Sequence, residues 1–232
     1  MADAFSSALI VGAGAGLSAS LARLFHKRGL TLALAARTPD DLAALAGETG
    51  ARTYGCDASR REDVDKLFAA LDRDFGAPDI VVYNASGRTR GPFVDLDPDA
   101  VAQAIAVSAY GGFLVAQQAV RRMLPKGRGA VLFTGASASV KGYAESAPFA
   151  MGKFALRGLA QSMARELSPK GIHVAHVVID GGIRSERRVE PVDRPDSLLD
   201  PDAIAQTYLH LIDQPRSAWS WEIEVRPWVE RF

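Results

Sequence analysis

A glycine-rich run near the start of the sequence is the residue group that points most directly to chemistry. Gly12, Gly14 and Gly16 alternate with alanine between an apolar stretch, Ala8–Val11, and an amphipathic segment that opens at Leu17. Glycines let the backbone turn tightly and approach a phosphate, and the N-terminus of a following helix carries partial positive charge. The placement between a strand and a helix predicts a pyrophosphate site for a dinucleotide. A tight turn without a ligand is the alternative.

The end of the second predicted strand indicates which dinucleotide fits. Thr31–Ala36 reads as this strand, and it is followed by Arg37 with no Asp or Glu at its end. NAD-binding proteins of this kind place an acid there to accept hydrogen bonds from the ribose 2′-hydroxyl, whereas a guanidinium offers planar donors suited to a 2′-phosphate. The sequence therefore favours NADP(H) over NAD(H), the alternative being that Arg37 is a solvated loop charge.

Composition excludes several other classes of function. The 232 residues carry 27 Lys+Arg against 27 Asp+Glu, so there is no basic excess of the kind that nucleic-acid binding usually leaves. The single cysteine, Cys56, permits neither an internal disulfide nor a cysteine metal cage, and the histidines form no ligand cluster. The chain shows no basic leader and no uninterrupted apolar run of about 18 residues. We therefore expect a cytoplasmic protein with no metal, no membrane span and no nucleic-acid partner.

Short apolar runs alternate along the chain with longer amphipathic segments. The predicted strands are Ala8–Val11, Thr31–Ala36, Arg52–Gly55, Ile80–Tyr83, Ala130–Thr134, Ile172–Ile179 and Trp221–Arg226. Most are apolar on both faces, which is typical of parallel strands covered by helices. The alternation predicts an α/β fold, a Rossmann-like doubly wound parallel sheet of about seven strands with helices on both faces, in a single domain over residues 1–232.

Helix starts are marked by short side chains that can accept backbone hydrogen bonds. Asp97 and Asp200 each precede a proline, the order expected of a cap residue followed by the first helical turn. Ser59 is followed three residues later by Glu62, which predicts a capping box. The charged segment 184–200 carries no helical pattern, and we interpret it as a short lid loop over a substrate rather than as a domain boundary.

Several sequence motifs occur together in one known family. Gly12 and Gly16 match two glycines of a Gly-x3-Gly-x-Gly motif, with Ser18 at the third, and Asn84-Ala85-Ser86-Gly87 is similar to an Asn-Asn-Ala-Gly stretch. The segment 163–172 fits as well. On these motifs the chain resembles the short-chain dehydrogenase/reductase family over essentially its whole length. The resemblance implies hydride transfer between a nicotinamide cofactor and a small-molecule substrate, in a homodimer or homotetramer built through the two long helices.

The resemblance also implies which residues hold the cofactor. Asp57, after the third strand, corresponds to an acid that contacts the adenine, and a helix cap is the alternative. The other implied cofactor positions are, in chain order, Gly12, Gly14, Gly16, Leu17, Arg37, Asn84, Ala85, Ser86, Lys153, Gly181 and Ile183.

The catalytic pattern of the family is broken in this chain. Members carry Tyr-x3-Lys on a long helix, where the tyrosine protonates the substrate carbonyl and the lysine lowers its pKa and holds the nicotinamide ribose. Lys153 matches the lysine. Phe149 stands at the tyrosine position, Ala136 at the usual serine and Ser108 at the usual asparagine. Because general acid–base catalysis contributes roughly 10²–10⁴-fold, loss of the phenol should nearly abolish carbonyl reduction by the family mechanism.

Residues close to these positions are candidates for the missing groups. Ser137 and Ser139 could supply a hydroxyl that orients a substrate, and Tyr143 could reach the site from the loop before the helix, with a surface position as the alternative. Asp180 could be a new acid or base, or only a turn residue. We take Lys153, Ser137 and Tyr143 as the catalytic candidates.

The lid segment adds three arginines to the candidate binding residues. Arg184, Arg187 or Arg188 binds an anionic substrate, or all three are solvated.

Two classes of overall function stay open. The first class is an NADP(H)-dependent oxidoreductase of unknown substrate with altered catalytic groups. The alternative is a catalytically silent NADP(H)-binding sensor or structural protein. Retention of Lys153 and of the loop after the sixth strand favours the enzyme, because these residues have little structural purpose if a nicotinamide never binds.

Overall fold

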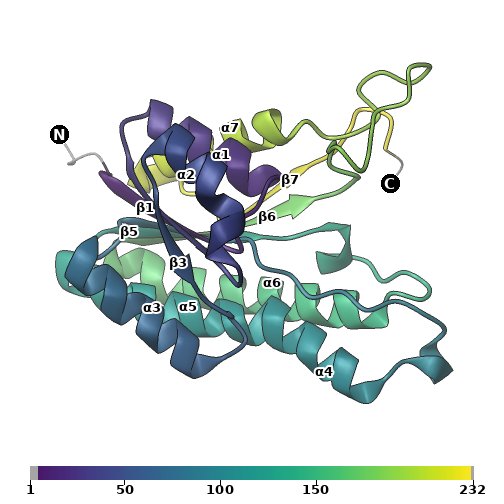
Figure 1. Cartoon of the computed structure of the whole chain (residues 1–232), viewed down its shortest axis with the longest axis horizontal. Coiled ribbons are helices and arrows are strands. Elements are labelled where there is room, and N and C mark those ends of the chain that lie inside the picture. Colours follow the sequence, from purple (N-terminus) through teal and green to yellow (C-terminus); the bar gives the residue numbers. More distant parts are fainter. Residues whose placement is uncertain (1–4, 231–232) are drawn as a thin grey trace.

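Seven strands form one parallel sheet in the order β3–β2–β1–β4–β5–β6–β7 in this computed structural model, which describes residues 5–230 (Figure 1). The strands are β1 (Ser7–Val11), β2 (Thr31–Ala36), β3 (Arg52–Gly55), β4 (Ile80–Tyr83), β5 (Gly129–Thr134), β6 (Ile172–Ile179) and β7 (Glu222–Val225). Four have the predicted bounds, and β1, β5 and β7 differ by one residue at one or both ends. The predicted doubly wound parallel sheet is confirmed.

Helices cover both faces of this sheet (Figure 1). One face carries α1 (Leu17–Lys27), α2 (Ala43–Thr49) and α7 (Pro201–Asp213), and the other carries α3 (Arg61–Asp74), α4 (Pro98–Ile105), α5 (Gly111–Met123) and α6 (Ala147–Leu167). Each face has its own apolar core, with Phe25 and Tyr208 in the first and Phe68 and Phe133 in the second. Both faces of the central strands are therefore buried, which explains why those strands are apolar throughout.

The predicted helix starts have mixed outcomes. Asp97 accepts hydrogen bonds from the backbone of Asp99 at 3.1 Å, and Asp200 accepts one from Asp202 at 2.9 Å, so both caps are confirmed. The capping box at Ser59 is wrong. Helix α3 follows Arg60, and the Ser59 hydroxyl donates instead to the Asp57 carboxylate at 2.7 Å.

One helical stretch among the described residues, Pro98–Lys126, is long and apolar enough in composition to cross a membrane, with a mean hydropathy of 1.4. It comprises α4, a π turn at Ala106–Tyr110, α5 and a short 3₁₀ turn. Its buried side includes Leu114, Val115 and Met123 in the core beside α3. Core helices of globular proteins pass the same compositional test, so this stretch is weak evidence for a membrane span.

The order of the strands fixes where a ligand can bind. The chain runs outward from β1 through β2 to β3 and then crosses to β4 on the other side of β1. In doubly wound sheets, ligands bind at the carboxyl ends of the strands where the order reverses in this way. The turns that carry Gly12, Asn84 and Ala136 follow β1, β4 and β5 at this edge, and the long loop after β6 leaves the sheet there as well (Figure 1).

Candidate active site

The turn after β1 uses its three glycines in different ways. Gly12 has a φ of +81°, and a Cβ there would lie 2.3 Å from the backbone nitrogen of Ala85, so packing alone requires glycine. Around Gly14 and Gly16, apart from their own chain neighbours, no heavy atom of residues 5–230 lies within 4 Å of the Cβ position. Helix α1 then begins at the buried Leu17 with no side-chain cap and no acid in its first turn. The turn thus leaves open space beside N–H groups that suit an anion.

Ser18 and Asn84 connect this turn to the neighbouring strand. The buried Ser18 hydroxyl donates to the Gly12 carbonyl at 3.0 Å and accepts from the Asn84 side-chain amide at 2.7 Å. The Asn84 backbone N–H donates to the Val11 carbonyl at 2.8 Å. The serine at the third glycine position therefore has a structural partner. Of the neighbouring cofactor candidates, Ala85 lies against Gly12 and Ser86 is exposed.

Arg37 and Asp57 lie near each other at the ends of β2 and β3. Arg37 is exposed, and within residues 5–230 its guanidinium forms no hydrogen bond or ion pair. Asp57 accepts hydrogen bonds from the backbone and hydroxyl of Ser59. The Ser59 hydroxyl lowers the pKa of Asp57 most, and the charge of Arg37 lowers it further. A guanidinium without a partner is thus available at the strand end where a 2′-phosphate would lie.

Helix α6 holds Lys153 and Phe149 one turn apart. Lys153 is buried, and its Nζ donates to the Thr134 carbonyl at 2.6 Å. Burial, followed by the charge of Arg88, lowers the pKa of Lys153 to about 7. The buried Phe149 ring lies 4.2 Å from the Arg88 guanidinium carbon and 5.9 Å from Lys153 Nζ, measured from the ring centroid. The ring at the tyrosine position therefore contacts two cations through its π system and offers no proton.

The hydroxyl groups of Ser108 and Ser139 form hydrogen bonds within the protein. Ser108 stands at the family's asparagine position in the resemblance, and Ser139 lies three residues after Ala136. Ser108, in the π turn, accepts a hydrogen bond from the Gly87 backbone at 3.0 Å and so holds the loop after β4. Ser139 accepts one from the Ala136 backbone at 3.1 Å and lies 3.3 Å from a buried His176 nitrogen. Because Ser139 is fully buried, the prediction that it could orient a substrate is wrong, and its role is to fix Ala136.

A pocket with a volume of about 380 Å³ lies beside Phe149. It is lined by Arg88, Arg90, Ala136, Ser137, Ala138, Tyr143, Ala144, Glu145, Ser146, Phe149, Ile179, Gly181, Gly182 and Arg188. The structure thus brings together Ser137 and Tyr143, two of the three catalytic candidates, in one pocket with Phe149. Lys153 lies deeper and is not part of the lining.

Asp180 anchors one wall of this pocket. It is buried, and its carboxylate forms ion pairs with Lys141 and Arg226, both at 3.2 Å. Burial raises the pKa of Asp180, but hydrogen bonds from Ser137 and Lys141 outweigh it, so the net pKa is below its ordinary value. An ionised carboxylate held in this way is a structural anchor rather than an acid that exchanges protons with a substrate.

The base of the lid is closed by backbone contacts. Ile183 forms a parallel β-bridge with Leu199, so the two ends of segment 184–200 lie side by side. Gly181 precedes it with a φ of +150°, and a Cβ there would lie 2.7 Å from Pro227. These contacts give the two proposed nicotinamide positions, Gly181 and Ile183, fixed places at the edge of the sheet.

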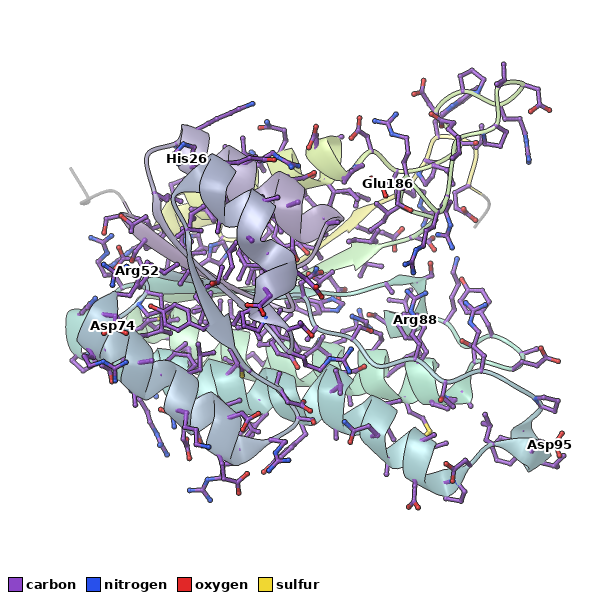
Figure 2. All side chains as sticks on the ribbon, viewed as in Figure 1. His26, Arg52, Asp74, Arg88, Asp95 and Glu186 are labelled. Carbon is purple, nitrogen blue, oxygen red and sulfur yellow. The ribbon has the colours of Figure 1, made fainter. Side chains whose placement is uncertain are left out.

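The lid arginines have different surroundings. Arg184 forms ion pairs with Asp200 at 2.6 Å and Glu190 at 3.7 Å, whereas Arg188 lines the pocket and Arg187 is exposed elsewhere. Sequence reasoning missed Arg88 and Arg90, which also line the pocket. Figure 2 shows Arg88 on the side of the molecule where the lid, marked by Glu186, leaves the sheet. The available signal was their position just after Asn84-Ala85-Ser86-Gly87, at the carboxyl edge of β4.

Comparison with known proteins places this geometry in a family. The short chain dehydrogenase family model matches residues 6–192. An uncharacterized oxidoreductase of Staphylococcus aureus strain N315 is 28% identical over 226 residues, which cover 95% of this chain and 96% of that protein.

Two crystal structures extend the likeness to three dimensions. A short-chain dehydrogenase from Rhodopseudomonas palustris is 33% identical with a TM-score of 0.82, and the match covers 96% of this chain and 99% of that one. A metagenomic short-chain oxidoreductase in complex with NADP is 26% identical with a TM-score of 0.84, and the match covers 97% and 98%. With the Rossmann-like sheet and the open glycine-rich turn, these matches show that the chain belongs to the short-chain dehydrogenase/reductase family of oxidoreductases.

Proposed function

We propose that this protein is an NADP(H)-dependent oxidoreductase of a small-molecule substrate, in which other groups replace the hydroxyls lost at Phe149 and Ala136. The observation that carries the proposal is the open space around Gly14 and Gly16. The backbone angles of Gly16, with φ of −87° and ψ of −129°, themselves favour glycine, whereas Gly14 has neither a neighbour nor a positive φ that requires it. A glycine at position 14, beside an uncapped helix start, is explained if a pyrophosphate approaches the backbone there.

The residues present fit the whole cofactor. The turn from Gly12 to Leu17 would hold the pyrophosphate, and Arg37 would pair with the 2′-phosphate while Asp57 contacts the adenine. On the other side of the crevice, Asn84, Ala85 and Ser86 would border the cofactor, and Gly181 and Ile183 would hold the nicotinamide, with Lys153 buried behind them on the Thr134 carbonyl. When bound, the nicotinamide donates or accepts a hydride. The NADP in the metagenomic relative supports this assignment.

The proton and the orientation of the substrate are assigned to groups of the pocket. Tyr143 carries a phenol into the lining, and we assign it the proton that the family tyrosine would supply. Ser137 would orient the substrate oxygen, because this serine lines the same pocket, and Asp180, which accepts its hydrogen bond, would fix the hydroxyl. Lys153 carries positive charge behind Phe149 below its pKa of about 7, which favours negative charge that develops on the substrate.

We also propose that the protein forms a homodimer or homotetramer through α5 and α6. Phe113 on α5 and Met151 and Phe154 on α6 are large apolar side chains that are 40–51% exposed. Light scattering coupled to size-exclusion chromatography tests this assignment, and a monomer at micromolar concentration would contradict it.

Cofactor preference is the direct test of the proposal. Titration calorimetry with NADPH and NADH is expected to give tighter binding of NADPH. Arg37→Ala should weaken NADPH binding by about 10- to 100-fold, the range for a hydrogen bond to a charged group, and leave NADH binding nearly unchanged. Arg52→Ala is a matched control, since Arg52 is also exposed but lies at the amino end of β3, away from the edge where the cofactor would bind. Equal effects of the two substitutions would overturn the assignment of Arg37.

The silent NADP(H)-binding protein is the second candidate. It is favoured by the contacts of Phe149, whose ring is packed against Arg88 and Lys153 in a way that does not need a hydroxyl. A panel of carbonyl and enone compounds with NADPH distinguishes the two. Turnover by the wild type supports the enzyme. A silent wild type that gains activity on Phe149→Tyr with Ala136→Ser supports the sensor.

A further inference from the structure

Three arginines line the pocket beside Phe149, and Glu145 is the one carboxylate among the described residues of its lining. Arg88 and Arg90 come from the loop after β4, and Arg188 comes from the lid. In the part of the chain that the structure describes, none of the three side chains forms an ion pair or a hydrogen bond. By contrast, the neighbouring Arg184 is paired with Asp200 at 2.6 Å.

The three guanidinium groups are close enough to repel one another. Burial, then the charges of Arg90 and Arg188, lower the pKa of Arg88, although it stays cationic in the neutral range. The Arg188 side chain lies over Gly182, where a Cβ would be 2.7 Å from Nη1, and Arg88 lies over the Phe149 ring. These contacts hold both groups at the pocket, and because both side chains are exposed, solvent screens much of the repulsion between them.

The acidic groups around the pocket do not remove this excess of positive charge. Glu145 is the one carboxylate in the described lining. Asp180 is buried nearby, but Lys141 and Arg226 neutralise it. Lys153 lies behind Phe149 and adds positive charge below pH of about 7. Three cations face one carboxylate, and an anionic ligand would relieve the imbalance.

We propose that this pocket binds a substrate that carries a carboxylate or phosphate group, held by Arg88, Arg90 and Arg188. This inference rests on the proposed function, in which the same pocket receives the substrate. A planar guanidinium donates two parallel hydrogen bonds to a pair of carboxylate or phosphate oxygens, so the cluster favours an anionic group with two adjacent oxygens. A volume of about 380 Å³ suits a small organic anion.

The cofactor's own phosphates do not account for the cluster. The residues assigned to them, Gly12 to Leu17 and Arg37, are absent from the pocket lining, whereas Phe149 and Ala136, at the catalytic positions, belong to it. The anionic group is therefore placed on the substrate side of the crevice.

Direct binding to the full chain tests this inference. The probes are benzoylformate, its neutral methyl ester, phenyl phosphate and inorganic phosphate, titrated by calorimetry with and without NADPH. We expect at least one anion to bind about 10- to 100-fold more tightly than the ester. Arg88→Gln and Arg188→Gln should each remove most of this preference, while Arg187→Gln, a lid neighbour outside the lining, should keep it. The relative affinities of benzoylformate and phenyl phosphate identify the anionic group.

The outcomes separate this inference from the proposed function. Binding of an anion that needs Arg88 and Arg188 in a protein that does not bind NADPH would sink the proposed function and keep the anion site. NADPH binding with no preference for any anion over the ester would overturn the anion site and keep the cofactor assignment. An anion that is lost on Arg37→Ala but kept on Arg188→Gln lies in the cofactor site, which also overturns the inference.

Discussion

The two sides of the crevice at the carboxyl edge of the sheet differ in how far they depart from the family pattern. On the β1 side, Gly12 and Gly16 are kept, and the one change, Ser18, has its own hydrogen bonds to Gly12 and Asn84. On the β5 side, Phe149 and Ala136 lack the family hydroxyls, and the pocket instead has the arginines Arg88, Arg90 and Arg188.

The difference follows from the kind of atom that does the work on each side. A pyrophosphate is bound by backbone N–H groups, so what matters on the β1 side is the path of the chain and the absence of side chains at two positions. Proton transfer needs one titratable side-chain atom at one place, and a single substitution removes it. The cofactor side can therefore persist while the chemistry of the other side changes. Each prediction that follows challenges one side of this comparison.

The largest expected effect belongs to Tyr143 on the substrate side. If its phenol supplies the proton, Tyr143→Phe lowers kcat by roughly 10²–10⁴-fold, which is about 3–5 kcal/mol in activation free energy. NADPH affinity should not change, because Tyr143 lines the substrate pocket. Steady-state kinetics with a carbonyl compound that the panel identifies as a substrate measure kcat. Tyr110→Phe removes an equally exposed phenol from the π turn and serves as the control. An unchanged kcat in Tyr143→Phe would assign the proton to another group.

The next effect separates packing from ligand binding within the glycine-rich turn. Gly12→Ala places a Cβ 2.3 Å from the Ala85 backbone at a φ of +81°, so the free energy of unfolding should fall by about 2–4 kcal/mol. Gly14→Ala meets open space, so we expect a stable protein that binds NADPH more weakly. Urea denaturation and calorimetry measure the two quantities. If Gly14→Ala binds NADPH as tightly as the wild type, the open space does not receive the pyrophosphate.

The buried Lys153, on the β5 side of the crevice, predicts that the free energy of unfolding depends on pH. Burial lowers the pKa of Lys153 from its ordinary 10.5 to about 7, so between these values the unfolded chain binds a proton that the folded protein lacks. The free energy of unfolding therefore rises with pH in this window by up to about 1.4 kcal/mol per pH unit from this group. Lys153→Met should remove that slope. Urea denaturation of both proteins at pH values of about 7.5, 8.5 and 9.5 compares how steeply the free energy of unfolding changes with pH. Parallel slopes would show that the lysine keeps its ordinary pKa.

Most of the fold could be predicted because it depends on patterns that extend over many residues. The apolar runs that became β2, β4 and β6 have their predicted bounds, since a strand buried on both faces leaves no other assignment for such a run. Ser59 shows the limit of local rules. Its spacing to Glu62 fits a capping box, but the nearby Asp57 carboxylate is a stronger acceptor and takes the hydroxyl.

The site could be predicted only where one segment carries it. The glycine-rich turn and Lys153 are defined within their own motifs, so the sequence alone was enough to propose them. The arginine cluster joins Arg88 from the loop after β4 with Arg188 from the lid, and no spacing rule relates residues so far apart in the chain. The sequence left Arg184, Arg187 and Arg188 as equal candidates. Only the ion pairs of Arg184 with Asp200 and Glu190 separate it from Arg188.

The smallest effect concerns Ser18, the one substitution on the cofactor side. Ser18→Ala removes the hydroxyl that joins the Gly12 carbonyl to the Asn84 amide, which should lower the free energy of unfolding by about 1 kcal/mol. Asn84→Ala removes the same Asn84–Ser18 bond from its other end. The double variant should therefore lose less stability than the sum of the two single losses.

A double-mutant cycle by urea denaturation measures this coupling between Ser18 and Asn84. If the two losses simply add, the 2.7 Å contact contributes nothing, and Ser18 is then only a tolerated replacement for glycine. If they couple while NADPH affinity stays the same in Ser18→Ala, the serine supports the turn without touching the cofactor. That result would support the proposal that the β1 side tolerates a side-chain change because its ligand contacts are made by the backbone.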